Sequence, residues 1–378
     1  MLPYGRQSIS AADIAAVVKV LRSDWLTQGP AIEQFEQRVA EYCGAKYAVA
    51  LANGTAALHL AALALDLKPG DQLWTSPITF VATANCALYC GAKVDFVDIN
   101  PRTYNLDVEQ LAAKLKKAKK IPKIVAPVHL AGQSCEMKAI RLLSNKYGFA
   151  VMEDASHAIG GSYQKKPVGD CRFSDLATFS FHPVKIITTA EGGMIMTNRR
   201  DIYEKACLLR THGITRDPKR MTEASHGPWY YQQIDLGYNY RITDLQAALG
   251  LNQMNRIGKF VQRRRALVQR YNELLKDLPV ETPWCHPDAN PSWHLYIVRV
   301  KKSHREVFET LRKNGIGVNL HYIPVHTQPY YQKLGFKTGD FPVAEKYYRE
   351  AISLPLYYEL TDRQQDRVVA ALKNALRA

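Results

Sequence analysis

Lys185, Asp154 and Ser180 are the residues of this chain whose types and order best suit covalent catalysis. Ser180 lies a few positions before Lys185, and Asp154 lies upstream in Glu153–His157. A pyridoxal phosphate (PLP) site requires an amine that condenses with the cofactor's aldehyde, a carboxylate that keeps the ring nitrogen protonated, and a hydroxyl that helps hold the phosphate. The three side chains together therefore predict a PLP site, although none of them would do so alone.

Gly54, Thr55 and Ala56 open an expected helix straight after an expected strand. The free backbone amides at such a helix start, together with the helix dipole, form a natural seat for a phosphate. Taken alone, the motif is more typical of an ordinary helix N-cap. Asp154 also has two interpretations, because a carboxylate at a strand end can pair with a pyridinium nitrogen or cap the next turn.

Lys185, Phe80 and His157 each also fit a role without chemistry. Most lysines are solvated, but Lys185 lies between two apolar strands and shortly before Gly192–Gly193, where a ligand could approach the backbone closely. Burial there would lower the pKa of the amine and favour the neutral nucleophile. Phe80 could stack on a flat ring or pack in the core, and His157 could brace the cofactor or serve the structure only.

Short apolar strands alternate with helices over the first half of the chain. The expected strands are Tyr47–Leu51, Gln72–Thr75, Lys93–Val97, Ile124–Val128, Ala150–Glu153, Leu176–Phe179 and Gly193–Met196. Helical patterns such as Thr83–Cys90 and Met137–Tyr147 separate several of them. This alternation predicts an α/β fold with a mostly parallel central sheet covered on both faces. Ligands of such sheets gather at the carboxyl ends of the strands, where the marked residues before 181 fall.

The last third of the chain has a different pattern. We expect strands at His294–Val300 and Gly317–Leu320, a helix at Arg305–Asn314 and a closing helix at Arg363–Leu376. The sequence thus predicts a large domain of residues 1–255 and a smaller C-terminal α+β domain of residues 256–378.

Composition narrows the class of protein. The chain has 378 residues, of which 47% are hydrophobic, so it can bury a full core and is neither fibrous nor disordered. Its net charge of +15 raises nucleic acid, a membrane surface or a polyanionic substrate as partners. The basic residues are dispersed, however, and the runs Lys116–Lys120 and Arg263–Arg265 are typical of solvated helix faces. We therefore predict neither a nucleic-acid nor a membrane partner.

The cysteines and the N-terminus bear on location. Seven cysteines without a paired spacing are typical of reduced thiols in a cytosolic protein. Cys86 and Cys90 lie close together, but no second Cys or His pair completes a zinc site, so we predict no metal. Residues 1–6 lack the basic region and apolar run of a signal peptide. We expect a soluble, cytoplasmic protein.

Five ordered motifs resemble those of the DegT family of PLP-dependent nucleotide-sugar aminotransferases. They are Trp25–Pro30, Asn53–Leu58, Glu153–His157, Ser180–Lys185 and Gly237–Arg241. The resemblance covers most of the chain and implies the type I aminotransferase fold and a homodimer with shared active sites.

The resemblance also implies roles for individual residues. Lys185 would bond covalently to PLP, Asp154 would pair with the ring nitrogen, and Phe80 would cover the ring. The residues implied to hold the phosphate are Thr55, Ala56 and Ser180, with Asn239 reaching the phosphate of the neighbouring subunit's cofactor. Gly54, at the same helix start, is also expected to bind the cofactor. We count His157 with these cofactor-binding residues.

A finer resemblance, carried by Tyr4–Gln7 and Gly317–His326, is to the family's transaminases of pseudaminic acid biosynthesis. It implies transfer of the amino group of L-glutamate to the C4 ketone of a UDP-linked 4-keto-6-deoxy-N-acetylhexosamine. The residues implied to contact the sugar nucleotide are Tyr4, Trp25, Leu26, Thr27, Gln28, Asn319, Leu320, His321 and Tyr322. Loop packing between domains is an alternative role for them.

Other functions stay open at this point. The substrate could be another nucleotide-linked keto sugar, either dTDP-linked or with its ketone at C3. Some similar proteins are sugar dehydratases in which histidine replaces the lysine, and the presence of Lys185 argues against that activity. A binding protein that has kept the fold without turnover is disfavoured because Lys185, Asp154 and Ser180 are all intact.

Overall fold

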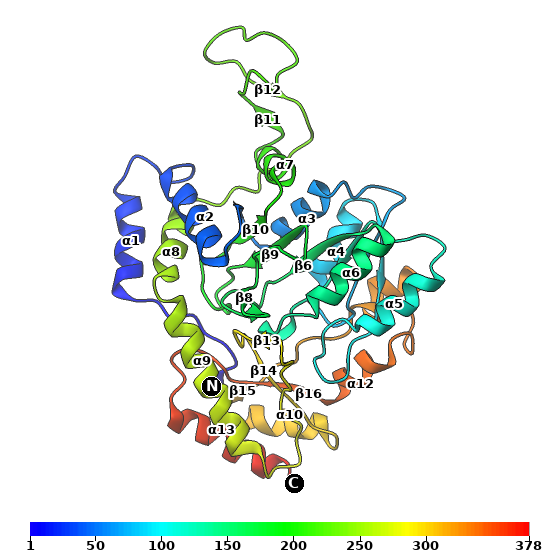
Figure 1. Cartoon of the computed structure of the whole chain (residues 1–378). Coiled ribbons are helices and arrows are strands. Elements are labelled where there is room, and N and C mark those ends of the chain that lie inside the picture. The colour runs from blue at the N-terminus through cyan, green and yellow to red at the C-terminus, as the bar shows by residue number, and fades with distance from the viewer. Residues whose placement is uncertain (378) are drawn as a thin grey trace.

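A twisted sheet forms the centre of the molecule (Figure 1), and the computed structural model describes residues 1–377. Its strands are β2 (Tyr47–Leu51), β3 (Gln72–Thr75), β4 (Lys93–Phe96), β5 (Ile124–Ala126), β6 (Ala150–Asp154), β9 (Leu176–Ser180) and β10 (Gly193–Thr197). Their order across the sheet is β2-β10-β9-β6-β5-β3-β4. β10 runs antiparallel to both of its neighbours, and the other neighbouring pairs are parallel. The prediction of a mostly parallel sheet is confirmed.

Helices cover both faces of the sheet because the strands are apolar on both sides. In β2, Val49 and Leu51 belong to one core cluster while Ala48 and Ala50 belong to another, as the two-residue period of a strand requires. The helices over the first face are α3 (Gly54–Ala64), α4 (Val81–Tyr89) and α7 (Arg200–Arg210). Those over the second face are α2 (Pro30–Cys43), α5 (Val108–Lys117), α6 (Met137–Tyr147) and α8 (Asp244–Met254), and α1 (Ala11–Leu21) packs outside α8.

A second group of elements follows the sheet in the chain and has its own core. These elements are α9 (Ile257–Leu275), β14 (Tyr296–Arg299), α10 (His304–Lys313), β15 (Ile316–Gly317), β16 (Ala351–Leu354) and α13 (Asp362–Ala375). β14 and β16 pair antiparallel, and β15 pairs in parallel with β1 (Leu2–Pro3). Leu2 therefore lies in the core cluster of the C-terminal elements. The division of the chain at residue 255 stays a prediction.

The expected strand Gly317–Leu320 is wrong in its extent. β15 ends at Gly317, and Asn319 makes only a single bridge to Ser353 of β16. Beyond it, the backbone forms a loop that borders the cavity described below, so these residues have no strand partner apart from that bridge.

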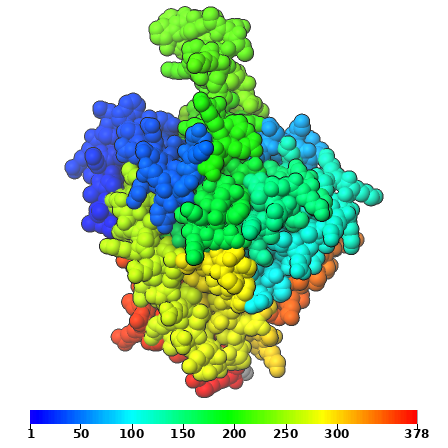
Figure 2. All heavy atoms as spheres, in the orientation of Figure 1, coloured from blue at the N-terminus to red at the C-terminus, as the bar shows by residue number. Residues whose placement is uncertain are grey.

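A narrow arm, residues 214–236, stands away from the body of the molecule (Figures 1 and 2). Its base is the antiparallel pair β11 (Ile214–Thr215) and β12 (Gln232–Gln233). Large apolar side chains are exposed on it, with Trp229 at 72% and Leu236 at 75%.

The remaining elements are short connections. They are β7 (Ser162–Tyr163), β8 (Lys166–Pro167), β13 (Ala289–Asn290), α11 (Pro329–Lys333), α12 (Pro342–Glu350) and the 3-10 turns Leu130–Gly132 and Val325–Thr327. Within residues 1–377, no helix combines the length and apolar character that crossing a bilayer requires.

Candidate active site

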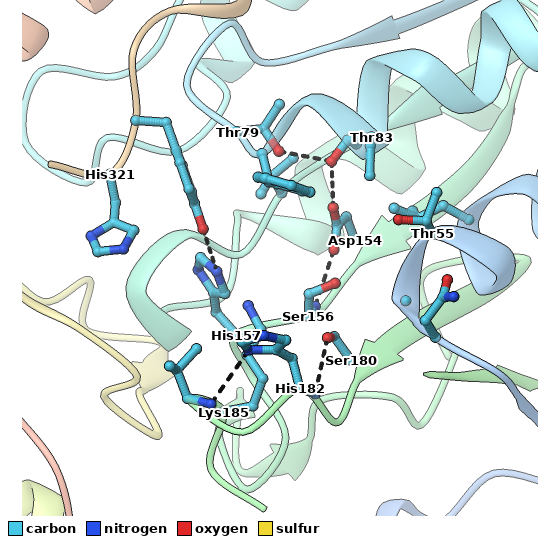
Figure 3. Close-up of a pocket in the computed structure, with 18 of the residues that line it drawn as sticks. Thr55, Thr79, Thr83, Asp154, Ser156, His157, Ser180, His182, Lys185 and His321 are labelled. Atoms are coloured by element: carbon cyan, nitrogen blue, oxygen red, sulfur yellow. Dashed lines mark hydrogen bonds between the residues drawn. The ribbon is translucent and has the colours of Figure 1, made fainter. Parts of the chain in front are cut away.

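A cavity of about 750 Å³ opens at the carboxyl ends of β6 and β9, beside the first turns of α3 and α4 (Figure 3). Its wall combines residues from the sheet region with residues from the N-terminus and from the loop after β15. The predicted site residues that line it are Tyr4, Gly54, Thr55, Ala56, Phe80, Asp154, His157, Ser180, Lys185, Asn319, Leu320, His321 and Tyr322. Segments far apart in the sequence thus meet at the sheet edge where ligands of such folds bind.

Five predicted site residues lie elsewhere. Trp25, Leu26, Thr27 and Gln28 are exposed in the segment before α2, and none of them borders the cavity. Asn239 is also exposed and follows the arm, where it bridges to Thr211. Within one chain, these residues therefore do not line the cavity, although Asn239 directly precedes Tyr240, which does.

Lys185 borders the cavity from the loop between β9 and β10. Its side chain is partly exposed because it opens onto the cavity, and the protein atoms around it remove much of its water. This desolvation lowers the pKa of the Lys185 amine to about 8, although the negative charge of Asp154 acts in the opposite direction. The interpretation of Lys185 as an ordinary solvated lysine does not fit this position.

Asp154 ends β6 and is 4% exposed. Its Oδ1 accepts a hydrogen bond from the Ser156 N–H at 3.1 Å, and its Oδ2 accepts one from Thr83 Oγ1 at 2.5 Å. Thr79 Oγ1 lies 2.7 Å from Thr83 Oγ1. The sequence motifs did not reveal the two threonines. Their i, i+4 spacing at a helix start was the available signal, but it is too common to indicate a site.

The first turn of α3 is arranged as the sequence predicts for an anion seat. Asn53 caps the helix through a 2.8 Å hydrogen bond from the Ala56 N–H to its side chain, and the Gly54 and Thr55 amides precede the first i→i−4 bond. A Cβ at Gly54 would lie 3.0 Å from Ser180 Cβ, so glycine lets the helix start approach β9. The N-cap interpretation is confirmed, and the anion seat, which the same turn would provide, stays a prediction.

Gly193 makes a close contact with backbone, whereas the sequence suggests a close approach by a ligand. A Cβ there would lie 2.3 Å from the Asn53 carbonyl oxygen, so the missing side chain lets β10 pack against the turn before α3. The close neighbour of this glycine is the Asn53 backbone rather than a ligand, and the contact holds the turn that is predicted to form the anion seat.

Histidines form the cavity wall near Lys185. His157 Nε2 is 3.1 Å from the Tyr322 hydroxyl, while its Nδ1 is buried without a partner among the described residues. Burial, reinforced by the charge of Lys185, holds the pKa of His157 well below its usual range. The same two causes lower the pKa of His321 to about 3. Both imidazoles are therefore uncharged at neutral pH, so they present polar groups without adding positive charge.

Phe80 lies at the mouth of the cavity rather than in the core. It is the N-cap residue of α4 and is 57% exposed. Its ring centroid is 6.1 Å from that of Tyr322, which comes from the loop after β15. Core packing does not account for this exposed ring, and the remaining interpretation is a ring that faces a flat ligand.

These groups fit PLP on structural grounds. The helix start suits the phosphate, the buried carboxylate suits a protonated ring nitrogen, and the amine of lowered pKa suits the aldehyde. By contrast, His, Cys, Asp and Glu side chains nowhere gather in residues 1–377 as a group of three or more that could hold a metal.

The chain matches the model of the DegT/DnrJ/EryC1/StrS aminotransferase family over residues 7–373. It is 38% identical to the spore coat polysaccharide biosynthesis protein SpsC of Bacillus subtilis, over 100% of this chain and 97% of that protein. It is also 38% identical to the UDP-4-amino-4,6-dideoxy-N-acetyl-beta-L-altrosamine transaminase of Campylobacter jejuni, over 95% of this chain and 93% of that protein.

Solved structures similar to this chain are also aminotransferases. PseC of Helicobacter pylori, an aminotransferase of pseudaminic acid biosynthesis, superposes with a TM-score of 0.91 at 31% identity, covering 100% of this chain and 99% of PseC. Spr1654 of Streptococcus pneumoniae, in its pyridoxamine phosphate form, gives a TM-score of 0.92 at 29% identity, with 100% and 99% coverage. It was also solved in its PLP form. This chain therefore belongs to the DegT/DnrJ/EryC1/StrS family and is a PLP-dependent aminotransferase of fold type I.

Proposed function

We propose that this enzyme transfers the amino group of L-glutamate to the C4 ketone of a UDP-linked 4-keto-6-deoxy-N-acetylhexosamine, in pseudaminic acid biosynthesis. The names of the C. jejuni and H. pylori relatives support this substrate and pathway. The observation that carries the proposal is the cavity in which Lys185 and Asp154 face residues of the segment Asn319–Tyr322, on which the finer resemblance rests.

Lys185 is the proposed catalytic acid and base. PLP, when bound, supplies an aldehyde that takes up the amino group and a ring that withdraws electrons from the reacting bond. The Lys185 Nζ removes the proton from the α-carbon of glutamate and later delivers a proton to the sugar carbon. A pKa of about 8 suits both tasks near neutral pH, whereas a pKa of about 3 keeps the His321 imidazole neutral and makes it too weak a base to take up a proton there.

The other residues bind and orient. Asp154 would hold the ring nitrogen, and Phe80 would cover the ring from the cavity mouth. The phosphate would lie against Gly54, Thr55, Ala56 and Ser180, at the positive end of the α3 dipole. His157, tethered to Tyr322, would brace the cofactor edge from the other side.

Tyr4 and the segment Asn319–Tyr322 are the proposed sugar contacts. Tyr4 lies against His321, with ring centroids 5.0 Å apart, and the two residues come from opposite ends of the chain. Burial raises the pKa of the Tyr4 hydroxyl, so it stays a neutral hydrogen-bond donor at working pH. Neutral donors suit sugar hydroxyl and amide oxygens.

We further propose a homodimer with shared sites. Asn239, Trp25 and Gln28 are exposed on a single chain and would reach the cavity of a second copy. The exposed Trp229 and Leu236 of the arm support such a contact, since large apolar side chains on a projecting segment are stabilised by a partner surface. The unpaired cysteines favour a cytoplasmic location for the enzyme.

A substrate panel tests the proposal. Purified enzyme with PLP and L-glutamate is offered UDP- and dTDP-linked keto sugars with the ketone at C4 or at C3, and products are identified by NMR. We expect a C4-aminated UDP sugar, with Lys185→Ala as the inactive control. Preferential amination of a dTDP-linked or C3-keto sugar would contradict the substrate assignment. A deoxygenated product without nitrogen would indicate dehydratase chemistry instead.

A further inference from the structure

Two buried threonines form a chain of hydrogen bonds that ends on Asp154 (Figure 3). Thr83 Oγ1 lies 2.5 Å from Asp154 Oδ2, and Thr79 Oγ1 lies 2.7 Å from Thr83 Oγ1. Thr79 is 1% exposed and Thr83 is 0% exposed, so water does not compete for these bonds. The chain of contacts therefore runs from the start of α4 to the carboxylate at the end of β6.

Hydrogen-bonding capacity fixes the direction of this chain. An ionised carboxylate only accepts, so Thr83 donates its single hydroxyl proton to Asp154. Thr83 then has only lone pairs left for its other contact, so Thr79 donates to Thr83. Each bond polarises the next, which strengthens the donor that reaches the carboxylate.

The two threonines also flank Phe80. The Thr83 N–H donates to the Phe80 carbonyl oxygen at 3.2 Å, at the start of α4. The hydroxyl bond between Thr79 and Thr83 thus closes the turn that presents the exposed Phe80 ring. One pair of side chains therefore fixes both the carboxylate and the aromatic ring at the cavity mouth.

We propose that Thr83, supported by Thr79, is a positioning residue that holds the Asp154 carboxylate oriented toward the cofactor's ring nitrogen. This inference rests on the proposed role of Asp154. With Oδ2 held by Thr83 and Oδ1 held by the Ser156 N–H, the carboxylate plane is fixed and its remaining lone pairs are free for the ring. Loss of the Thr83 donor leaves the carboxylate with only the Ser156 contact, so its plane is no longer fixed toward the ring.

Four variants separate this role from general packing. Thr83→Val keeps the shape of the side chain but removes the hydroxyl, whereas Thr83→Ser keeps the hydroxyl. Thr79→Val removes only the outer bond. Thr75→Val is the matched control, because Thr75 is equally buried and its Oγ1 donates to the Ala126 carbonyl oxygen at 2.7 Å, away from the cavity.

The readouts are the affinity of the apoenzyme for PLP and the pH midpoint at which the visible absorbance of the bound cofactor titrates. A hydrogen bond to a charged group predicts about tenfold or greater weakening of PLP binding in Thr83→Val. Its absorbance midpoint should move in the same direction as in Asp154→Asn, by less. We expect Thr83→Ser to restore both values, Thr79→Val to show a smaller shift of the same sign, and Thr75→Val to match wild type.

A double variant decides the outcome. If Thr83 acts through Asp154, Thr83→Val adds nothing in an Asp154→Asn background. Wild-type PLP affinity and midpoint in Thr83→Val, or in Thr79→Val if Thr83→Val does not fold, would overturn the inference. No sugar enters these measurements, so a wrong substrate assignment leaves them unchanged. An Asp154→Asn variant that binds PLP and titrates like wild type would instead overturn the proposed role of Asp154.

Discussion

The predicted site residues fall into two groups that lie in different places on the single chain. The cofactor group, Asp154, Ser180 and Lys185 among them, meets in one cavity built on strand ends and helix starts. The surface group, Trp25 to Gln28 and Asn239, is exposed on segments outside it. The contrast teaches that one chain gathers most of the predicted cofactor residues by itself, whereas Asn239, predicted to reach a neighbouring cofactor's phosphate, lies outside the cavity. In the proposed homodimer, the surface group contributes to the cavity of a second copy.

The largest effect is expected from the cofactor group. Lys185→Ala removes the amine that bonds to PLP and carries the proton, so turnover should fall to background. The fold should remain, because the side chain points into a cavity and supports no core cluster. Activity is measured with glutamate and the keto sugar, and the fold by circular dichroism. Retained turnover in a folded Lys185→Ala variant would contradict the mechanism.

A mixing experiment tests the surface group. Asn239→Asp places a negative charge where the phosphate of the neighbouring cofactor is expected, so this variant alone should be nearly inactive. Co-expressed with Lys185→Ala, it should form hybrid dimers in which one of the two sites has both wild-type residues. Random assembly then predicts recovery of about one quarter of wild-type activity. Each variant expressed alone is the control, and no recovery in isolated hybrids would show that Asn239 does not act across an interface.

The share of the structure that could be predicted from the sequence also differs between regions of the molecule. The strands and the helix starts behind Thr55 and Asp154 were predictable, because apolar runs and turn residues are local signals. The arm had no such signal, since β11 and β12 are two-residue strands whose pairing depends on the chain between them. The contact between Thr83 and Asp154 joins α4 to the end of β6, and no local pattern specifies such a tertiary contact.

Within the cavity, the role that the family resemblance implies for Tyr322 also differs from the contact that its side chain makes. Tyr322 was assigned to the sugar nucleotide, but its hydroxyl contacts His157, a residue assigned to the cofactor. The assignment could not have separated these roles, because the two residues come from distant segments that only the fold brings together. Tyr322 therefore connects the cofactor side of the cavity to its substrate side.

Tyr322→Phe tests that connection, and its expected effect is of intermediate size. Removing one buried hydroxyl leaves His157 Nε2 without its partner, a loss of about 1 kcal/mol or more, or roughly five- to tenfold. We expect this weakening in PLP affinity as well as in turnover. Tyr4→Phe is the matched control on the substrate side and should raise KM for the sugar while leaving PLP affinity unchanged. The connection fails if Tyr322→Phe changes only KM for the sugar.

The smallest expected effect is on the free energy of unfolding. Its dependence on pH should differ between Lys185, in the cofactor group, and Trp25, in the surface group. Lys185 has a folded pKa of about 8 against an ordinary 10.5, so the unfolded chain binds the proton more tightly. Below pH 8 the folded apoenzyme bears the cost of a charged, desolvated amine. Between pH 8 and 10.5 the folded amine is neutral while the unfolded one is not, so this cost fades as pH rises.

Replacing the amine should therefore stabilise the apoenzyme. Lys185→Met is expected to raise the free energy of unfolding at pH 7 by about 1–2 kcal/mol, a value reduced for the partial exposure of the side chain. The gain should shrink toward zero as pH approaches 10.5. Trp25→Ser, from the surface group, should show no such pH dependence, because an exposed uncharged ring has no proton linked to folding. Denaturant melts at several pH values measure both, and a gain for Lys185→Met that stays constant with pH would mean that packing, rather than the desolvated charge, is its cause.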